Sequence, residues 1–172
     1  MDVVIREARE ADLASVHSIY AWHVENGLAS FEEVPPEVDE ITRRWQDVRA
    51  RNLPYLVAEL DARVVGYAYA SPYRARSAYR FTVEDSVYLE RGTYGKGIGR
   101  ALLSDLIARC ERLGFAQMIA VIGDSENLAS IGLHAAMGFA RAGLLSAVGF
   151  KHGHWVDSVI MQRPLGERAA DA

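Results

Sequence analysis

The sequence has a single cysteine, Cys110, among its 172 residues, and it has no long hydrophobic run. One cysteine cannot form an intramolecular disulfide, which is typical of a protein from a reducing compartment. A membrane-spanning helix needs about 18 consecutive apolar residues, and no segment approaches that length. The first residues include Asp2 and Glu7, whereas a signal peptide begins with a basic and then an apolar segment. We therefore expect a cytoplasmic protein with no membrane partner.

Excess positive charge is also missing, because 19 Lys and Arg residues face 23 Asp and Glu residues for a net charge of -4. A nucleic-acid-binding surface needs a basic patch, so we expect no nucleic-acid partner. The charge is unevenly spread, however, since residues 62–83 contain four arginines and no acidic residue. From charge alone, a solvated loop is the favoured interpretation of this arginine-rich segment.

Half of the residues are hydrophobic and 24% are charged, which is the composition of one globular domain. Apolar periodicity predicts strands near 3–5, 55–60, 64–70, 81–89, 118–122, 144–150 and 155–161, and helices near 12–26, 36–52, 98–113 and 127–137. Asp12 is a candidate N-cap, and the wholly apolar segment 118–122 predicts a strand covered on both faces. The pattern indicates one α/β domain with a mixed sheet over residues 1–164 and a polar tail over 165–172.

A glycine cluster separates the predicted strand 81–89 from the next helix. Glycines let the backbone approach a ligand closely, and the N–H groups of a helix start attract phosphate. A P-loop is excluded because Lys96 is followed by Gly97 rather than Ser or Thr. The spacing of Gly95, Gly97 and Gly99 also departs from the dinucleotide motif G-x-G-x-x-G. A turn that merely needs glycine stays open as the alternative.

Residues 94–99, Tyr-Gly-Lys-Gly-Ile-Gly, resemble the R/Q-x-x-G-x-G/A motif of the GCN5-related N-acetyltransferases (GNAT), with Tyr94 in place of the usual Arg or Gln. Residues 127–139 resemble the second signature of that family, in which an Asn opens a helix that ends in Gly-Phe. Segments 73–79, 82–88, 120–123 and 149–157 are similar to the phosphinothricin and methionine sulfoximine acetyltransferases. The resemblance extends from about Ile5 to Pro164. It implies a single-domain GNAT fold with a mixed, mostly antiparallel twisted sheet flanked by helices.

The resemblance also implies that acetyl-CoA is the cosubstrate. The cofactor-binding residues would then be Val87, Tyr88 and Leu89 for the pantetheine, through their backbone, and Gly95, Lys96, Gly97, Ile98, Gly99 and Arg100 for the pyrophosphate. Asn127 is a further pantetheine contact, with a helix N-cap as its purely structural alternative. We expect no metal, because His152 and His154 have no cysteine and few carboxylates nearby.

Two residues are candidates for catalysis. Amine acetylation needs a base, because an α-amino group is mostly protonated at neutral pH. Glu84 fills that role by resemblance, and strand alternation predicts that its neighbour Asp85 faces the opposite side. His134 occupies the place of a proton-transfer group in the phosphinothricin subfamily, and an imidazole can act as acid or base. The structural alternatives are a surface carboxylate and a packed core histidine.

The resemblance assigns substrate contacts to Arg74, Arg76, Tyr79 and Phe31, as well as to Glu84. Arginine side chains suit carboxylate, phosphinate and sulfoximine oxygens, which gives the arginine-rich segment a ligand. The roles of Lys151 and His152 stay open. Cys110 lies on the apolar face of its helix, so we expect a buried, inert thiol and direct acetyl transfer in a ternary complex.

We thus predict an acetyl-CoA-dependent N-acetyltransferase acting on the α-amino group of phosphinothricin, methionine sulfoximine or sulfone, or a similar small amino acid, and working as a homodimer. One alternative is an acetyltransferase for another amine, such as a protein amino terminus or a polyamine. The other is a non-catalytic acyl-CoA sensor.

Overall fold

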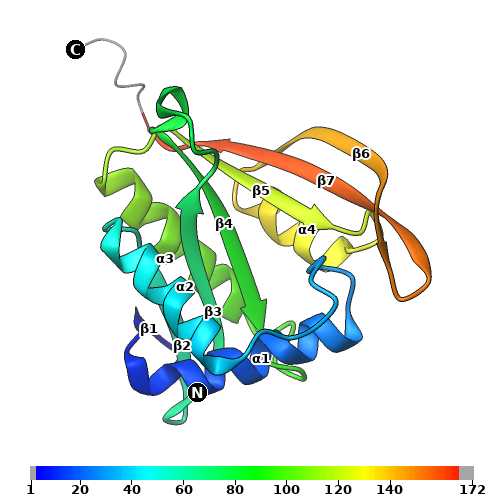
Figure 1. Ribbon diagram of the computed structural model, residues 1–172. Helices are drawn as coiled ribbons and strands as arrows, with labels where there is room; N and C mark the ends of the chain where they lie inside the picture. The colour runs from blue at the N-terminus through cyan, green and yellow to red at the C-terminus, as the bar shows by residue number, and fades with distance from the viewer. Residues whose placement is uncertain (1–2, 167–172) are drawn as a thin grey trace.

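A seven-stranded sheet in the order β1-β2-β3-β4-β5-β7-β6 forms the centre of the molecule (Figure 1). The computed structural model describes residues 3–166. The strands are β1 (Val4–Glu7), β2 (Tyr55–Leu60), β3 (Arg63–Pro72), β4 (Thr82–Leu89), β5 (Gln117–Gly123), β6 (Ala140–Lys151) and β7 (His154–Pro164). The α-helices are α1 (Leu13–Asn26), α2 (Val38–Ala50), α3 (Ile98–Arg112) and α4 (Leu128–Ala136). Every predicted element is present and in the predicted order.

All strand pairs are antiparallel except β4 and β5, which run parallel, so the prediction of a mixed and mostly antiparallel sheet is confirmed. Helices cover both faces of the amino-terminal half of the sheet (Figure 1). Tyr88 packs edge-to-face on Tyr20 of α1, whereas the backbone at Gly66 on the other face lies against Leu102 of α3. No helix within residues 3–166 is both long and apolar enough to span a bilayer.

The parallel pair separates halfway along. Residues Thr82–Asp85 of β4 pair with Gln117–Ala120 of β5, and the ladder ends there. The next residues of β4 continue to pair with β3, and the next residues of β5 continue to pair with β7. The two strands therefore diverge after Asp85. Val121, the next residue of β5, is 41% exposed, so the expectation that segment 118–122 is covered on both faces is wrong at this residue.

Two local expectations at the ends of elements need correction. Asp12 is the N-cap residue of α1, as predicted, but its side chain accepts no helix N–H, because the carboxylate accepts two hydrogen bonds from Arg6, at 2.7 and 2.9 Å, and one from the Arg9 N–H. The hydrogen bond from Arg6 lowers the pKa of Asp12. Leu165, which we assigned to the polar tail, is only 2% exposed and its N–H donates to the Ala116 carbonyl. Residues 167–172 of that predicted tail lie outside the described residues.

The loop between α1 and α2 is held against the sheet by buried polar contacts. Lys151 is 2% exposed, and its ammonium group donates to the Ser30 carbonyl at 2.6 Å. The Tyr20 hydroxyl forms a hydrogen bond with the Ser30 hydroxyl and donates another to the Glu32 carboxylate. Glu32 also forms a bidentate ion pair with Arg44 of α2. This network gives Lys151 a structural role and fixes the loop beside the point where β4 and β5 separate.

Gly123 offers a test of how closely the loop approaches β5. A Cβ atom at this position would lie 2.5 Å from the Leu28 carbonyl oxygen and 2.8 Å from that of Ala29. Backbone atoms cannot give way as a side chain can, so Gly123→Ala should destabilise the fold by about 1–3 kcal/mol. Urea unfolding followed by circular dichroism measures this change.

Gly132→Ala is the matched control for this substitution. Gly132 lies within α4 and its Cβ would meet no atom within 4 Å. Alanine should therefore be neutral there or stabilise the protein by about 0.5–1 kcal/mol. Equal stability of the Gly123→Ala variant and the wild type would contradict the close loop contact.

Candidate active site

A cleft of about 460 Å³ opens where β4 and β5 diverge. Its walls come from the end of β4, the loop after α1, and the start of α4. Of the residues predicted to bind cofactor, four line it: Val87, Tyr88, Leu89 and Asn127. Tyr94, from the glycine-rich loop, lines it too. Residues from the segments 23–29, 87–94 and 124–133 thus form one cavity.

The backbone of β4 presents unpaired edge groups to this cleft. The Glu90 N–H donates to Val65 at 2.8 Å, so Glu90 faces β3. Because backbone directions alternate along a strand, Tyr88 also faces β3, whereas Val87 and Leu89 face the cleft. His23 of α1 donates a hydrogen bond from its Nε2 to the Leu89 carbonyl oxygen at 2.8 Å. Val87 is therefore the main backbone site on this edge, and Tyr88 contributes its ring rather than its backbone.

The glycine-rich loop leads into the amino end of α3. Gly95 and Gly97 have φ values of +75° and +79°, which side chains rarely adopt. Gly97 is the N-cap of α3, and within the described residues no side chain accepts from the first N–H groups of the helix. These N–H groups and the positive end of the helix dipole suit an anion such as a phosphate. Lys96 and Arg100 are exposed beside them.

Asn127 has the structural role that we gave as its alternative. Its side-chain oxygen accepts the Ser130 N–H at 3.2 Å and so caps α4. The same side chain lies on the cleft wall, and the N-cap bond uses only its oxygen. Its NH₂ group is therefore available to a ligand in the cleft.

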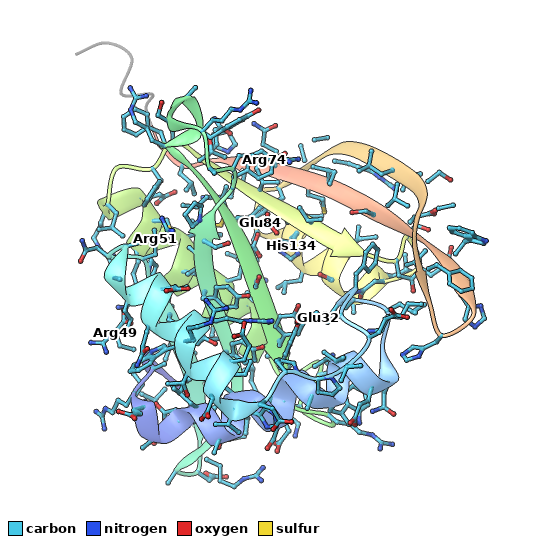
Figure 2. All side chains as sticks on the ribbon, viewed as in Figure 1. Glu32, Arg49, Arg51, Arg74, Glu84 and His134 are labelled. Carbon is cyan, nitrogen blue, oxygen red and sulfur yellow. The ribbon has the colours of Figure 1, made fainter. Side chains whose placement is uncertain are left out.

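Glu84 lies on the last paired stretch of β4, close to where the cleft begins (Figure 2). Burial raises the pKa of its carboxyl group, and the charge of Asp85 raises it further. Arg74, in the turn between β3 and β4, partly offsets this effect. A half-buried carboxyl group with a raised pKa is suited to take a proton near neutral pH.

The structure places Asp85, rather than Glu84, against His134. The distance from His134 Nε2 to Asp85 Oδ2 is 2.8 Å, and the side chains are only 4% and 1% exposed. His134 Nδ1 lies 2.7 Å from the Ser130 carbonyl oxygen. Burial lowers the pKa of His134, but the hydrogen bond and the charge of Asp85 outweigh this, so the net shift is upward. Asp85 faces the opposite side from Glu84, as strand alternation predicted.

Sequence reasoning assigned no role to Asp85. The signal was available, because an aspartate on the buried side of a strand, between Val83 and Val87, needs a polar or charged partner. The identity of that partner could not be read from the chain, since His134 lies 49 residues further on. His23 was missed for the same reason.

The predicted substrate-contact residues are not equally close to Glu84. Arg74 influences the pKa of Glu84, and its guanidinium lies over the Tyr73 ring. Tyr79 packs edge-to-face on Tyr73 with centroids 5.6 Å apart. Tyr79 ends a short 3₁₀ turn, Ser77–Tyr79, and Arg76 is exposed directly before that turn. The Phe31 ring packs over the backbone at Gly123 and Gly149 and does not line the cleft.

Within residues 3–166, no group of three or more His, Cys, Asp or Glu side chains is placed to hold a metal ion.

A family model of the acetyltransferase (GNAT) domain matches residues 5–160. The chain is 57% identical over 161 residues to a phosphinothricin N-acetyltransferase of Alcaligenes faecalis, covering 94% of this chain and 82% of the relative. It is 38% identical over 168 residues to an L-methionine sulfoximine/L-methionine sulfone acetyltransferase of Salmonella typhimurium, covering 98% of both.

A solved structure shows the same architecture. It is the crystal structure of a GNAT superfamily phosphinothricin acetyltransferase from Sinorhizobium meliloti in complex with AcCoA. The TM-score is 0.95 with 51% sequence identity, and the match covers 99% of this chain and 92% of that one.

The hydrogen bond from His23 to the Leu89 carbonyl should contribute to the stability of the folded protein in a pH-dependent way. Burial lowers the pKa of His23 in the folded state, so its contribution is present above the unfolded pKa of about 6.5 and is lost as the pH falls. The stability advantage of the wild type over His23→Phe should be about 1 kcal/mol at pH 7.5, from the lost hydrogen bond, and smaller at pH 5. Urea unfolding at both pH values measures it.

His154→Phe serves as the control, because His154 is exposed on β7. Its stability difference from the wild type should stay constant between the two pH values. An advantage over His23→Phe that grows toward pH 5 would contradict the burial of a neutral His23.

Proposed function

The chain belongs to the GNAT acetyltransferase family, and on this basis we propose that it transfers the acetyl group of acetyl-CoA to the α-amino group of a small amino acid. The substrates we propose are phosphinothricin, methionine sulfoximine and methionine sulfone, the compounds named for its relatives. The observation that carries the proposal is the open edge of β4, with the Glu84 carboxyl group at one end and the helix start of α3 at the other.

The cleft suits acetyl-CoA in shape and in polarity. Backbone N–H and C=O groups at Val87 are free to pair with the amides of a pantetheine arm, much as another strand would. The N–H groups at residues 95–100 suit the pyrophosphate, and Tyr94 offers a ring in place of a charged side chain at the rim. The Asn127 amide is a further donor to the pantetheine.

In the proposed reaction, Glu84 takes a proton from the ammonium group of the substrate, directly or through a water molecule. The neutral amine then attacks the thioester carbonyl, and a backbone N–H on the open edge of β4 stabilises the oxyanion. The nitrogen of the tetrahedral intermediate releases its second proton to solvent. Transfer is direct, because Cys110 is fully buried and burial raises the pKa of its thiol to about 12, which leaves it protonated and inert.

Arg74 is the better placed of the two proposed substrate arginines, since it acts electrostatically on Glu84. Its guanidinium would bind the carboxylate or the phosphinate oxygens of the substrate. Arg76 and Tyr79 lie on the same turn, and Phe31 supplies an apolar wall from the opposite loop. We propose a cytoplasmic location, in keeping with the free thiol.

The proposed reaction is tested by measuring CoA release with phosphinothricin, methionine sulfoximine, methionine sulfone, a polyamine and a peptide amino terminus. Turnover is expected with the three amino acids. Glu84→Gln should lower kcat by about 10²–10⁴-fold, the usual size of general base catalysis, because the amide cannot accept the proton. Calorimetry should show acetyl-CoA binding unchanged.

Glu25→Gln is the matched control, since Glu25 is exposed on α1, and it should keep full activity. Full turnover by Glu84→Gln would refute its role as the base. Acetyl-CoA binding without turnover of any amine would instead indicate a sensor, and turnover of the peptide or polyamine alone would indicate a different substrate class.

We also propose that the protein forms a homodimer through β6 and β7. Five large apolar side chains of these two strands are exposed: Leu144, Leu145, Val148, Phe150 and Trp155, of which Trp155 is 71% exposed. The Phe150 and Trp155 rings pack together with centroids 5.0 Å apart, and exposed apolar side chains gathered on neighbouring strands support a protein interface. β6 is also the edge strand of the sheet.

Trp155→Ser should therefore shift the protein from dimer to monomer in sedimentation velocity, because it removes the most exposed aromatic side chain of this surface. Val34→Ser is the control, since Val34 is 77% exposed but lies in the loop before α2. A wild type that sediments as a monomer at all concentrations would refute the dimer.

A further inference from the structure

The buried pair of Asp85 and His134 has more hydrogen-bonding capacity than a packed core histidine needs. Asp85 Oδ2 contacts His134 Nε2, but Asp85 Oδ1 is buried without a hydrogen-bond partner among residues 3–166. Both residues line a small pocket of about 60 Å³ that adjoins the cleft, and this volume is enough for a water molecule. An unpaired carboxylate oxygen is costly to bury, which points to a function for this pair.

The partners of His134 determine how many protons the pair holds. The Ser130 carbonyl can only accept, so Nδ1 must carry a proton. Asp85 is also an acceptor when ionised, so a second proton is needed between Nε2 and Oδ2 to make that contact a hydrogen bond. Whichever atom carries it, the pair holds one proton more than a carboxylate beside a neutral imidazole. The upward pKa shift of His134 agrees with this count.

Ser130 connects the pair to the cleft. Its hydroxyl oxygen lies 3.4 Å from His134 Nδ1, and Ser130 lines both the small pocket and the larger cleft. The three side chains therefore form a chain from buried carboxylate to cleft wall, in the order Asp85, His134, Ser130. Phe139 packs edge-to-face on the imidazole at 5.0 Å and helps to fix its plane.

We propose that Asp85 is a positioning residue that holds a proton on His134, and that Ser130 passes this proton to the sulfur of the departing CoA. This inference rests on the proposed acetyl transfer. When the C–S bond of the tetrahedral intermediate breaks, its electron pair goes to sulfur. The sulfur takes the proton of the Ser130 hydroxyl, which takes the Nδ1 proton of His134. The imidazole is left neutral, with its Nε2 proton still shared with Asp85, and is recharged from solvent.

The two faces of β4 then carry opposite proton transfers. Glu84 accepts a proton from the amine on one face, and the Asp85–His134 pair supplies a proton to the thiolate on the other. This division excludes His134 as the base, because neither of its ring nitrogens has a lone pair free for the amine. A histidine held between two acceptors is an acid.

The ionisable groups around the pair are few. Cys110 of α3 feels the charge of Asp85, but it stays a neutral thiol over the range in which histidine titrates. Glu84 is the neighbour on the same strand, and its pKa is raised by burial and by Asp85. Neither group supplies a positive charge that would keep His134 protonated in the absence of Asp85.

The first test follows the protonation of His134 by NMR of the ligand-free protein with ¹⁵N-labelled histidine. In the wild type, His134 should stay protonated to a pH above its ordinary pKa of about 6.5. In Asp85→Asn, burial acts without an opposing charge, so the titration should move below that value. Asp105→Asn, which removes a carboxylate from the outer side of α3, is the control and should leave the titration in place. An identical titration of His134 in Asp85→Asn would overturn the proposal.

The second test separates the Ser130 hydroxyl from the helix cap. Ser130→Ala keeps the N–H that Asn127 accepts and the carbonyl that His134 contacts, so the fold and the His134 titration should be unchanged. kcat should fall by about tenfold or more while KM for acetyl-CoA stays the same, and Ser130→Thr should restore kcat. Ser18→Ala, which removes an exposed helix hydroxyl on α1, should match the wild type.

The pH profile of kcat distinguishes an acid from a base. If His134 supplies a proton, Asp85→Asn moves the loss of activity at high pH to a lower pH. Full kcat in Ser130→Ala, or an Asp85→Asn profile that coincides with the wild type, would overturn the relay. The NMR titration needs no substrate, so a wild type that acetylates none of the amines refutes the proposed function and leaves the Asp85–His134 assignment to be decided separately.

Discussion

The divergence of β4 and β5 after the Asp85–Ala120 pair is the constraint on which the rest of the site depends. A continuous parallel ladder would consume the edge groups of Val87 and Leu89, and the space between the strands would not exist. Beyond this point β4 stays paired with β3 and β5 stays paired with β7, so both antiparallel ladders continue past the separation. The unpaired polar edge that results is costly in an isolated domain, and it is suited to bind a ligand that pairs with the backbone.

The alternation of side chains along β4 places two acidic residues on opposite faces of the sheet beside this edge. Glu84 projects to the face covered by α1 and α2, where half-burial raises its pKa. Asp85 projects to the face covered by α3 and α4, where it meets His134. One strand thus carries the proposed proton acceptor on one side and the proposed proton-donating pair on the other, with the cleft beginning directly after both. Two adjacent residues meet different surroundings because successive side chains of a strand point to opposite faces of the sheet.

The loop after α1 limits the cleft on its remaining side, and its position is set by contacts from distant parts of the chain. Lys151 of β6 reaches the Ser30 carbonyl, Arg44 of α2 binds Glu32, and Gly123 of β5 leaves room for the carbonyls of Leu28 and Ala29. Burying an ammonium group with a neutral carbonyl as its partner costs free energy of folding. Here the contact fixes the wall opposite the Val87 edge, so that β4, α4 and the loop enclose a single cavity.

The sequence by itself determined the elements, their order, the glycine-rich turn and the outward and inward sides of β4, because periodicity and backbone preferences are local properties. It also determined the family, since the motifs at residues 94–99 and 127–139 are contiguous. The termination of the β4–β5 ladder, the exposure of Val121, the pairing of Asp85 with His134 and the bond from His23 to Leu89 were decided only by the tertiary structure. Each of them joins residues that are far apart along the chain, and no local preference records which partner a buried charge or an open strand edge will meet.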